Sequence, residues 1–203
     1  MIELATKPNP SMAPIDCLGV VLSGGQSSRM GKDKAGLIRN NESMLAFSQH
    51  ILKQTGVKET VVSTNSQNTH VGTPDLIANA GPLGGIYSVI AKHKPKALLI
   101  LPVDLPLITV SVLEKLKTTG ELTQKACYYE DNFLPLYLPI NSFTEMFFET
   151  AMKNLSGKGP SIRAMLKQVP HQALSLTDNK ALFNTNTPEQ WQQAKQDFIK
   201  QNL

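Results

Sequence analysis

An apolar, β-branched segment runs directly into a glycine-rich, basic loop near the start of this 203-residue chain. The segment ends at Leu22, and the loop that follows, residues 23–34, has the sequence Ser-Gly-Gly-Gln-Ser-Ser-Arg-Met-Gly-Lys-Asp-Lys. Glycines let main-chain N–H groups approach an anion closely, and Arg29, Lys32 and Lys34 add positive charge. The junction therefore predicts a buried strand that is followed by a phosphate-binding loop.

The loop differs from the two commoner phosphate-binding motifs. A P-loop has four residues between its glycines and a Ser or Thr after the lysine, whereas here five residues separate Gly25 from Gly31, and Asp33 follows Lys32. The chain also contains no G-x-G-x-x-G run. A P-loop NTPase is therefore disfavoured, and anion binding by another motif is expected.

Strand-like and helix-like segments alternate along the rest of the chain, which predicts a parallel sheet covered by helices. The most continuous apolar run, residues 97–103, is typical of a central strand that is buried on both faces. We expect a Rossmann-like, three-layer α/β sandwich with a mostly parallel central sheet. Its strands are predicted at residues 18–23, 60–64, 76–78, 97–103, 126–130 and 133–138, and its helices at residues 44–54, 83–92, 109–118, 141–153, 161–168 and 188–200.

Length and composition narrow the class of protein. The length suits a single domain over residues 17–203, while residues 1–16, with three prolines and no long apolar core, are expected to form a flexible leader that is neither a signal peptide nor a membrane span. Two cysteines without metal-ligand spacing favour a reducing cytoplasm. The net charge of +4 favours small anionic ligands, but the scattered basic residues predict neither nucleic acid nor membrane binding.

Asp104 stands at the carboxyl end of the apolar run, between two prolines. Ligands of open α/β sheets bind at this edge, where the loop after the first strand also lies. Because Mg²⁺ takes carboxylate and triphosphate oxygens together, Asp104 is predicted to be a metal ligand, with a turn or helix cap as the alternative. Lys34 and Arg29 are predicted to bind phosphates, with solvated surface charges as the alternative.

Two further segments carry candidate site residues. In Gly-Pro-Leu-Gly-Gly-Ile, residues 81–86, the glycines Gly84 and Gly85 lower helix stability, so a ligand or a strand is expected to pack closely against them. Near the C-terminus, Thr187 followed by Pro188 is typical of a helix start, which leaves Asn184 and Asn186 available to bind a substrate. Residues 156–159 with Arg163 predict either a basic lip over an anionic substrate or a solvated loop.

Residues 22–34 resemble the signature Leu-(Ala/Ser)-Gly-Gly-x-Ser-x-Arg-Met-Gly-x-Asp-Lys of the sugar-nucleotidyltransferase-like family, and most closely that of the molybdenum cofactor guanylyltransferases. The segments at Asp104, at residues 81–86 and at residues 183–189 resemble further motifs of that family. The resemblance implies that residues 17–203 form a nucleotidyltransferase domain. It implies catalytic roles for Arg29, Lys34 and Asp104, nucleotide binding by Leu22, Ser23, Gly24, Gly25, Lys34, Asn79 and Asp104, metal binding by Asp104, and substrate binding by Gly84, Asn184 and Asn186.

The resemblance also implies a reaction. GMP would pass from GTP to the phosphate of molybdenum-bound molybdopterin, with Mg²⁺ as cofactor and pyrophosphate as the leaving group. The residues Ser23-Gly24-Gly25 resemble the guanylyl type more than the Ala-Ala-Gly of cytidylyl relatives. Other molybdenum cofactor biosynthesis proteins and molybdoenzyme chaperones are candidate partners. The alternatives are a molybdopterin cytidylyltransferase or sugar-phosphate nucleotidyltransferase of the same fold, and a non-catalytic nucleotide-binding protein.

One position departs from the family pattern. Many members carry an Asp at the end of the third strand, and Asn79 is the residue expected there. An amide can bind a base or ribose but is a poor metal ligand. Asp75 is the nearest carboxylate, but the strand predicted at residues 76–78 places it at the wrong end.

Overall fold

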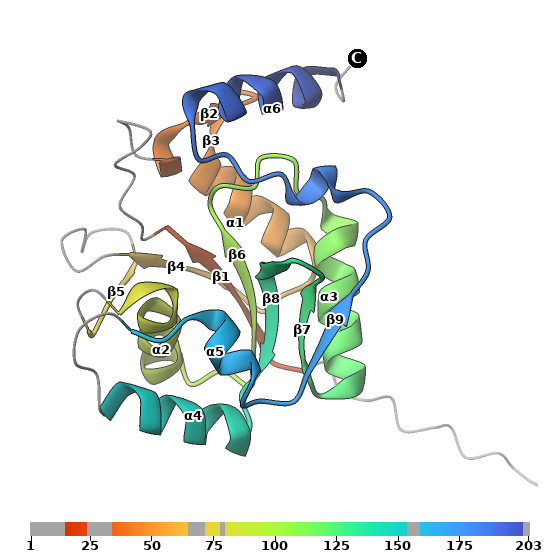
Figure 1. The fold of residues 1–203 in the computed structure, drawn as a ribbon. Coiled ribbons are helices and arrows are strands. Elements are labelled where there is room, and N and C mark those ends of the chain that lie inside the picture. Colours follow the sequence, from red (N-terminus) through yellow and green to blue (C-terminus); the bar gives the residue numbers. More distant parts are fainter. Residues whose placement is uncertain (1–14, 24–33, 65–71, 78–79, 154–158, 201–203) are drawn as a thin grey trace, which may run out of the picture.

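The computed structural model describes residues 15–23, 34–64, 72–77, 80–153 and 159–200. Residues 199 and 200 are described by their backbone alone. Their chain folds around one large sheet with helices on both sides (Figure 1). The predictions for residues 1–14, for Gly24, Gly25, Arg29 and Lys32, for Asn79, and for the basic loop at residues 156–158 lie outside the described residues.

Seven strands form the sheet, in the order β5-β4-β1-β6-β8-β7-β9. β8 runs antiparallel to both of its neighbours, and every other pairing in the sheet is parallel. At the centre, Val20 of β1 pairs with Val61 of β4 on one side and with Ile100 of β6 on the other. The strands are β1 (Cys17–Leu22), β4 (Thr60–Thr64), β5 (Thr73–Pro74), β6 (Ala97–Pro102), β7 (Ala126–Tyr129), β8 (Asn132–Pro139) and β9 (His171–Leu174).

Two helical layers cover the sheet, and the side chains of the central strands alternate between them. Leu99 and Leu101 of β6 belong to the apolar core under α1, α3 and α6, whereas Leu98 and Ile100 belong to the core under α2, α4 and α5. These four side chains are buried, as expected for a strand covered on both faces. The helices are α1 (Met44–Gln54), α2 (Gly81–His93), α3 (Val110–Thr123), α4 (Ser142–Lys153), α5 (Ile162–Leu166) and α6 (Pro188–Lys200).

The three-layer α/β sandwich predicted from the sequence is therefore confirmed. The bounds predicted for α1, β4 and α6 agree with the structure. Asn141 caps α4, because its Oδ1 accepts from the N–H groups of Phe143 and Thr144. None of the helices in the described ranges is long and apolar enough to cross a bilayer.

The strand predicted at residues 76–78 is wrong. The strand of this region is β5, at Thr73–Pro74, and the Leu76 N–H donates to Ser88 Oγ instead of to a neighbouring strand. The Asp75 N–H still donates to the carbonyl oxygen of Thr64, the last residue of β4, at 3.1 Å, and Leu76 has turned away from that strand. Leu76 is apolar but 64% exposed, and apolar character alone therefore misplaced the strand.

Short elements and edge strands were not predicted. These are β9, the hairpin β2 (Ile38–Arg39) and β3 (Glu42–Ser43), and the 3₁₀ turns η1 (Lys34–Gly36) and η2 (Asn179–Leu182). β9 pairs in parallel with β7 at the edge of the sheet and has only one buried side chain, Leu174. The apolar pattern that indicates a strand is therefore weak at this edge.

Helix α3 extends five residues beyond its predicted end at residue 118. Gly120 lies within this extension, inside the helix and against the buried ring of Tyr137 on β8. A Cβ at residue 120 would overlap that ring. Gly120 is therefore a packing residue that lets α3 approach the sheet.

Gly120→Ala is expected to lower the stability of the protein by about 1–3 kcal/mol, because the added methyl group overpacks a closed core. Alanine has a higher helix propensity than glycine, but this gain is smaller than the loss from overpacking. For a chain of this size, the melting temperature should fall by roughly 2–4 °C for each kcal/mol. Gly36→Ala is the matched control, because a Cβ at Gly36 has no neighbour within 4 Å. A Gly120→Ala protein that melts with the control would contradict the packing argument.

Candidate functional site

The strand order places a ligand crevice at the carboxyl ends of β1 and β6. The chain passes from β1 outward to β4 and β5, then crosses to β6 on the other side of β1. The next strands after β1 therefore lie on one side of the β1–β6 pair and those after β6 on the other, and such a switch point is where open α/β sheets bind ligands. A pocket of ≈ 710 Å³ opens there, and Leu22, Ser23, Pro102 and Asp104 are among the residues that line it.

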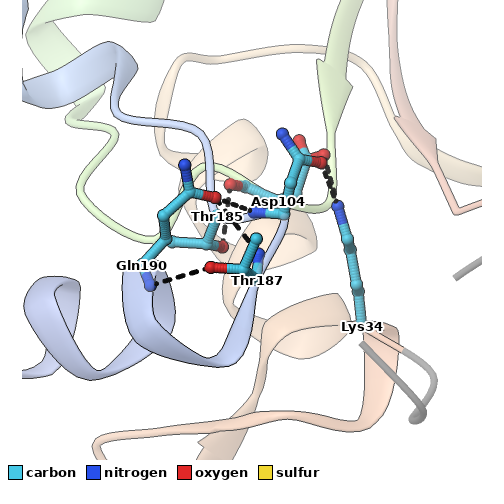
Figure 2. Close-up of polar contacts among 6 residues, drawn as sticks. Lys34, Asp104, Thr185, Thr187 and Gln190 are labelled. Atoms are coloured by element: carbon cyan, nitrogen blue, oxygen red, sulfur yellow. Dashed lines mark hydrogen bonds and ion pairs between the residues drawn. The ribbon is translucent and has the colours of Figure 1, made fainter. Parts of the chain in front are cut away.

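Three polar side chains from distant parts of the chain meet beside this pocket. Lys34 comes from η1, Asp104 from the turn after β6, and Asn186 from the segment before α6. Lys34 Nζ donates to Asp104 Oδ2 at 3.1 Å and to Asn186 Oδ1 at 2.6 Å. Figure 2 shows the lysine side chain reaching up to the carboxylate. The sequence predicted each of these residues for the site, and the structure brings them together.

The C-terminal segment is anchored to Asp104 through the main chain. Thr185 donates twice to the Asp104 carbonyl oxygen, from its N–H at 3.0 Å and from its Oγ1 at 3.2 Å (Figure 2). This pair of bonds, made by a threonine that is 1% exposed, joins the turn after β6 to the start of α6. The neighbouring residue Asn186 is thereby placed close to the site.

A capping box starts α6 and orders the same segment. Gln190 Oε1 accepts from the N–H groups of Asn186 at 2.7 Å and Thr187 at 3.1 Å, while Thr187 Oγ1 accepts from the Gln190 N–H at 3.3 Å. These bonds satisfy N–H groups that a helix start leaves unpaired. The predicted helix start at Thr187 is confirmed, and the backbone of Asn186 is held by the same contacts.

Arg39 joins the segments that carry the three polar residues, although no sequence motif indicated it. Its Nε donates to the Pro106 carbonyl oxygen at 2.7 Å, just after Asp104. The guanidinium group lies 3.9 Å from the ring centroid of Phe47 on α1 and 5.2 Å from that of Phe198 on α6. The hairpin β2–β3 accordingly lies beside α6 in Figure 1. A lone arginine in a short hairpin gives no recognisable signal in the sequence.

The Asp104 carboxylate fits the role of a Mg²⁺ ligand. Its Oδ1 is buried and has no hydrogen-bond partner among the described residues. Within those residues no group of three or more His, Cys, Asp or Glu could hold a metal ion by itself. Mg²⁺ is usually held by one or two carboxylates together with substrate phosphates, so a single carboxylate beside a phosphate-sized pocket suits this ion.

Asp75 lies on the site edge of the sheet, so the expectation that it sits at the wrong end of its strand is corrected. Because β5 ends at Pro74, Asp75 directly follows the carboxyl end of that strand and lines the pocket. Burial raises the pKa of the Asp75 carboxyl above its usual value, while a hydrogen bond from Ser63 lowers it. Asp75 Oδ1 has no hydrogen-bond partner in the described part of the chain. Asp75 and Ser63 are thus polar pocket residues, of which the sequence reasoning discounted the first and missed the second.

The two glycines of α2 occupy different environments. Gly85 lines the pocket, and a Cβ at this position would overlap Ser63 Oγ on β4 and lie 3.2 Å from Asp75 Oδ1. Gly84 is buried against Ala80 and is not among the pocket-lining residues of the described chain. The predicted close approach of a strand is therefore found at Gly85, and substrate binding by Gly84 stays a prediction.

The far wall of the pocket comes from the second half of the chain. It consists of the β7–β8 hairpin, the segment that leads into α5, and Asn184, with Asp131, Asn132, Phe133, Leu134, Gly159, Pro160, Ser161, Ile162, Arg163 and Asn184 as lining residues. Gly159 packs directly on the backbone of Ala80, which brings this segment to the start of α2. Asn184 was predicted for the site, and for Arg163 a place over the substrate was one of two alternatives. The hairpin agrees with the strands predicted at residues 126–130 and 133–138, but its place at the pocket was not predicted, although β7 ends at the same edge of the sheet as β6.

The fold is shared with solved structures of nucleotidyltransferases. The structure resembles molybdopterin-guanine dinucleotide biosynthesis protein A from Archaeoglobus fulgidus, with a TM-score of 0.69, 18% identity, and coverage of 90% of this chain and 99% of that chain. It also resembles 2-C-methyl-D-erythritol 4-phosphate cytidylyltransferase from Thermus thermophilus, with a TM-score of 0.64, 10% identity, and coverage of 92% and 100%.

The family follows from the sequence. The family model described as "MobA-like NTP transferase domain" matches residues 19–175, and the chain belongs to this family. The chain is also similar to the molybdenum cofactor guanylyltransferase of Xanthomonas euvesicatoria pv. vesicatoria (strain 85-10), with 36% identity over 176 residues that cover 85% of this chain and 91% of that protein. The family resemblance predicted from the motifs is confirmed.

Proposed function

We propose that this protein is a guanylyltransferase that moves GMP from GTP to the phosphate of molybdenum-bound molybdopterin and releases pyrophosphate. The observation that carries the proposal is the contact of Lys34 with Asp104 at the switch point of the sheet, beside a pocket of ≈ 710 Å³. A relative that is 36% identical is named a molybdenum cofactor guanylyltransferase, which supports this substrate pair.

The proposed reaction needs no protein nucleophile. A phosphate oxygen of the acceptor attacks the α-phosphorus of GTP, a new P–O bond forms, and the bond from the α-phosphorus to the bridging oxygen breaks as pyrophosphate leaves. Catalysis of this kind consists mainly of positioning the phosphates and compensating their charge. A Mg²⁺ ion held by Asp104 would compensate charge on the phosphates when bound. Lys34 and Arg29 are proposed to bind and orient the phosphate groups.

The two walls of the pocket suggest where the substrates bind. We place the nucleotide against the ends of β1, β4 and β6, where Ser23, Ser63 and Asp104 line the pocket. We place the acceptor on the far wall, where Arg163 can meet a phosphate and the exposed amide of Asn184 can donate to a pterin or phosphate oxygen. The acceptor phosphate would then face the α-phosphate of GTP across the pocket.

The proposal includes the setting of the protein. We propose a cytoplasmic location, which the free, buried thiols of Cys17 and Cys127 support because a reducing compartment keeps such thiols unpaired. Other molybdenum cofactor biosynthesis proteins and molybdoenzyme chaperones are proposed as partners that supply the acceptor or receive the product.

GTP with Mg²⁺ is expected to raise the melting temperature of the protein more than CTP, UTP or ATP with Mg²⁺ at the same concentration. At equal concentration, the ligand with the highest affinity for the folded state stabilises that state most. Equal or greater stabilisation by CTP would favour a cytidylyltransferase. Release of pyrophosphate on addition of the acceptor distinguishes an enzyme from a protein that only binds nucleotide, and sugar 1-phosphates as acceptors test the remaining alternative.

A further inference from the structure

Neither carboxylate oxygen of Asp104 is available to a metal ion in the structure as it stands. Oδ2 accepts from Lys34 Nζ at 3.1 Å, and Oδ1 is buried. The side chains of Lys34 and Asp104 are only 15% and 18% exposed. A divalent cation needs direct contact with a carboxylate oxygen, and the ammonium group would repel a cation that approached it. Metal binding through Oδ2 therefore requires Lys34 to move, whereas Oδ1 has no partner among the described residues.

Asn186 holds Lys34 in the position that covers Asp104. Its Oδ1 accepts from Lys34 Nζ at 2.6 Å, a shorter distance than that from the ammonium to the carboxylate. The backbone N–H of Asn186 is held in turn by Gln190 Oε1 at 2.7 Å. The ammonium thus lies between two oxygen acceptors on segments that the main chain anchors to each other through Thr185.

We propose that Asn186 is a positioning residue that keeps Lys34 on Asp104 in the free protein, so that a metal ion reaches Asp104 only together with nucleotide phosphates. The proposal rests on the proposed function for the identity of the ligand that releases the lysine. A triphosphate offers Lys34 new anionic partners. When the ammonium group moves from Asp104 to the phosphates, the Asp104 carboxylate is left without a counter-charge. The divalent cation then restores the charge balance between Asp104 and the phosphates.

This arrangement predicts opposite effects of one substitution. Removing the Lys34 ammonium removes the competitor of the metal ion, so the free protein should bind metal more tightly. The same change removes a partner of the phosphates, so nucleotide should promote metal binding less than in the wild type. Lys34 thus competes with the metal ion and attracts the nucleotide. The binding of these two ligands is therefore coupled, and each raises the affinity for the other by the same factor. A lysine with only a structural role would not produce this change of sign.

The test uses Mn²⁺ as a paramagnetic probe in place of Mg²⁺, with free Mn²⁺ measured by electron paramagnetic resonance in titrations of the full chain without nucleotide. Lys34→Met is expected to bind Mn²⁺ about tenfold more tightly than the wild type, in the range typical of coupled sites. Asn186→Ala should shift the affinity in the same direction by less, because Lys34 keeps its contact with Asp104. Lys58→Met is the matched control, because Lys58 also pairs with an aspartate, Asp16, at 3.0 Å, but neither residue lines the pocket, and this variant should leave Mn²⁺ affinity unchanged.

Circular dichroism and melting curves establish that each variant is folded, and Lys34→Gln provides a second substitution that removes the charge. The proposal would be overturned if the folded Lys34 variants bind Mn²⁺ as tightly as the wild type or more weakly.

Repeating the titration with GTP separates this proposal from the proposed function. If GTP tightens Mn²⁺ binding equally in the wild type and in Lys34→Met, the covering of Asp104 is overturned while the proposed function stands. If Lys34→Met binds Mn²⁺ more tightly but no nucleotide affects the wild type, the covering of Asp104 is supported and the proposed function is contradicted.

Discussion

Asp104→Asn is expected to lower Mg²⁺-dependent guanylyl transfer at least a hundredfold, which corresponds to about 3 kcal/mol of activation free energy. The amide keeps the shape of the side chain but removes the charge that would hold the metal. Charge that develops on the α-phosphate and the pyrophosphate in the transition state would then lack its compensation. The measurement is the turnover rate at saturating GTP over a range of Mg²⁺ concentrations.

The melting temperature of Asp104→Asn separates a metal ligand from a structural aspartate. The Asn oxygen still accepts a hydrogen bond from Lys34, and the Asp104 carbonyl keeps its bonds from Thr185, so stability should fall by only about 1 kcal/mol. Asp178→Asn is the matched control, because this exposed carboxylate caps η2, outside the pocket, and an amide preserves the cap. A folded Asp104→Asn protein with near-normal turnover would refute the metal assignment.

Lys34→Ala is expected to weaken GTP binding about tenfold to a hundredfold, the range expected when hydrogen bonds to a charged group are lost. The side chain projects from a short turn and contributes little to the apolar cores, so the fold should persist. Calorimetric titration with MgGTP gives the affinity, and a melting curve gives the stability.

Lys58→Ala is the control for this variant. Lys58 also pairs with an aspartate, Asp16, at 3.0 Å, but the two side chains are 66% and 39% exposed and lie away from the pocket. Surface pairs of this kind contribute little to stability, and Lys58→Ala should bind GTP as the wild type does. If Lys34→Ala unfolds, or binds GTP as tightly as Lys58→Ala, Lys34 has a structural role instead of a phosphate-binding one.

The candidate site was predictable wherever a residue type is unusual for its structural context. Asp104 directly follows a continuous apolar strand, and Asn184 and Asn186 stand before a helix start that does not need them. Lys34 ends a glycine-rich loop after another buried strand. A charged or amide group at such a position has no explanation in packing, so local sequence was sufficient to identify it.

Other site residues lack such a signal. Asp75 was misjudged because the apolar residues Leu76 and Ile77 suggested a strand, whereas strand β5 lies before them, at Thr73–Pro74. Arg39 and the β7–β8 hairpin reach the site through contacts with segments far away in the chain. The role of Gly120 depends on a distant residue in the same way, because the ring that packs on it belongs to β8.

The sequence by itself determined the layers of this protein and the family to which it belongs. The spacing of apolar residues predicts strands and helices, because each kind of element buries one face and so repeats apolar residues at its own interval. The glycine-rich loop identifies the family through its local chemistry. Only the tertiary structure decided that Lys34, Asp104 and Asn186 form one cluster. The order of the strands, the anchoring of α6 by Thr185 and the contact that covers the carboxylate all depend on side chains from distant segments. Such contacts leave no periodic trace in the chain, because the free energy that selects them comes from packing and charge pairing in the assembled fold.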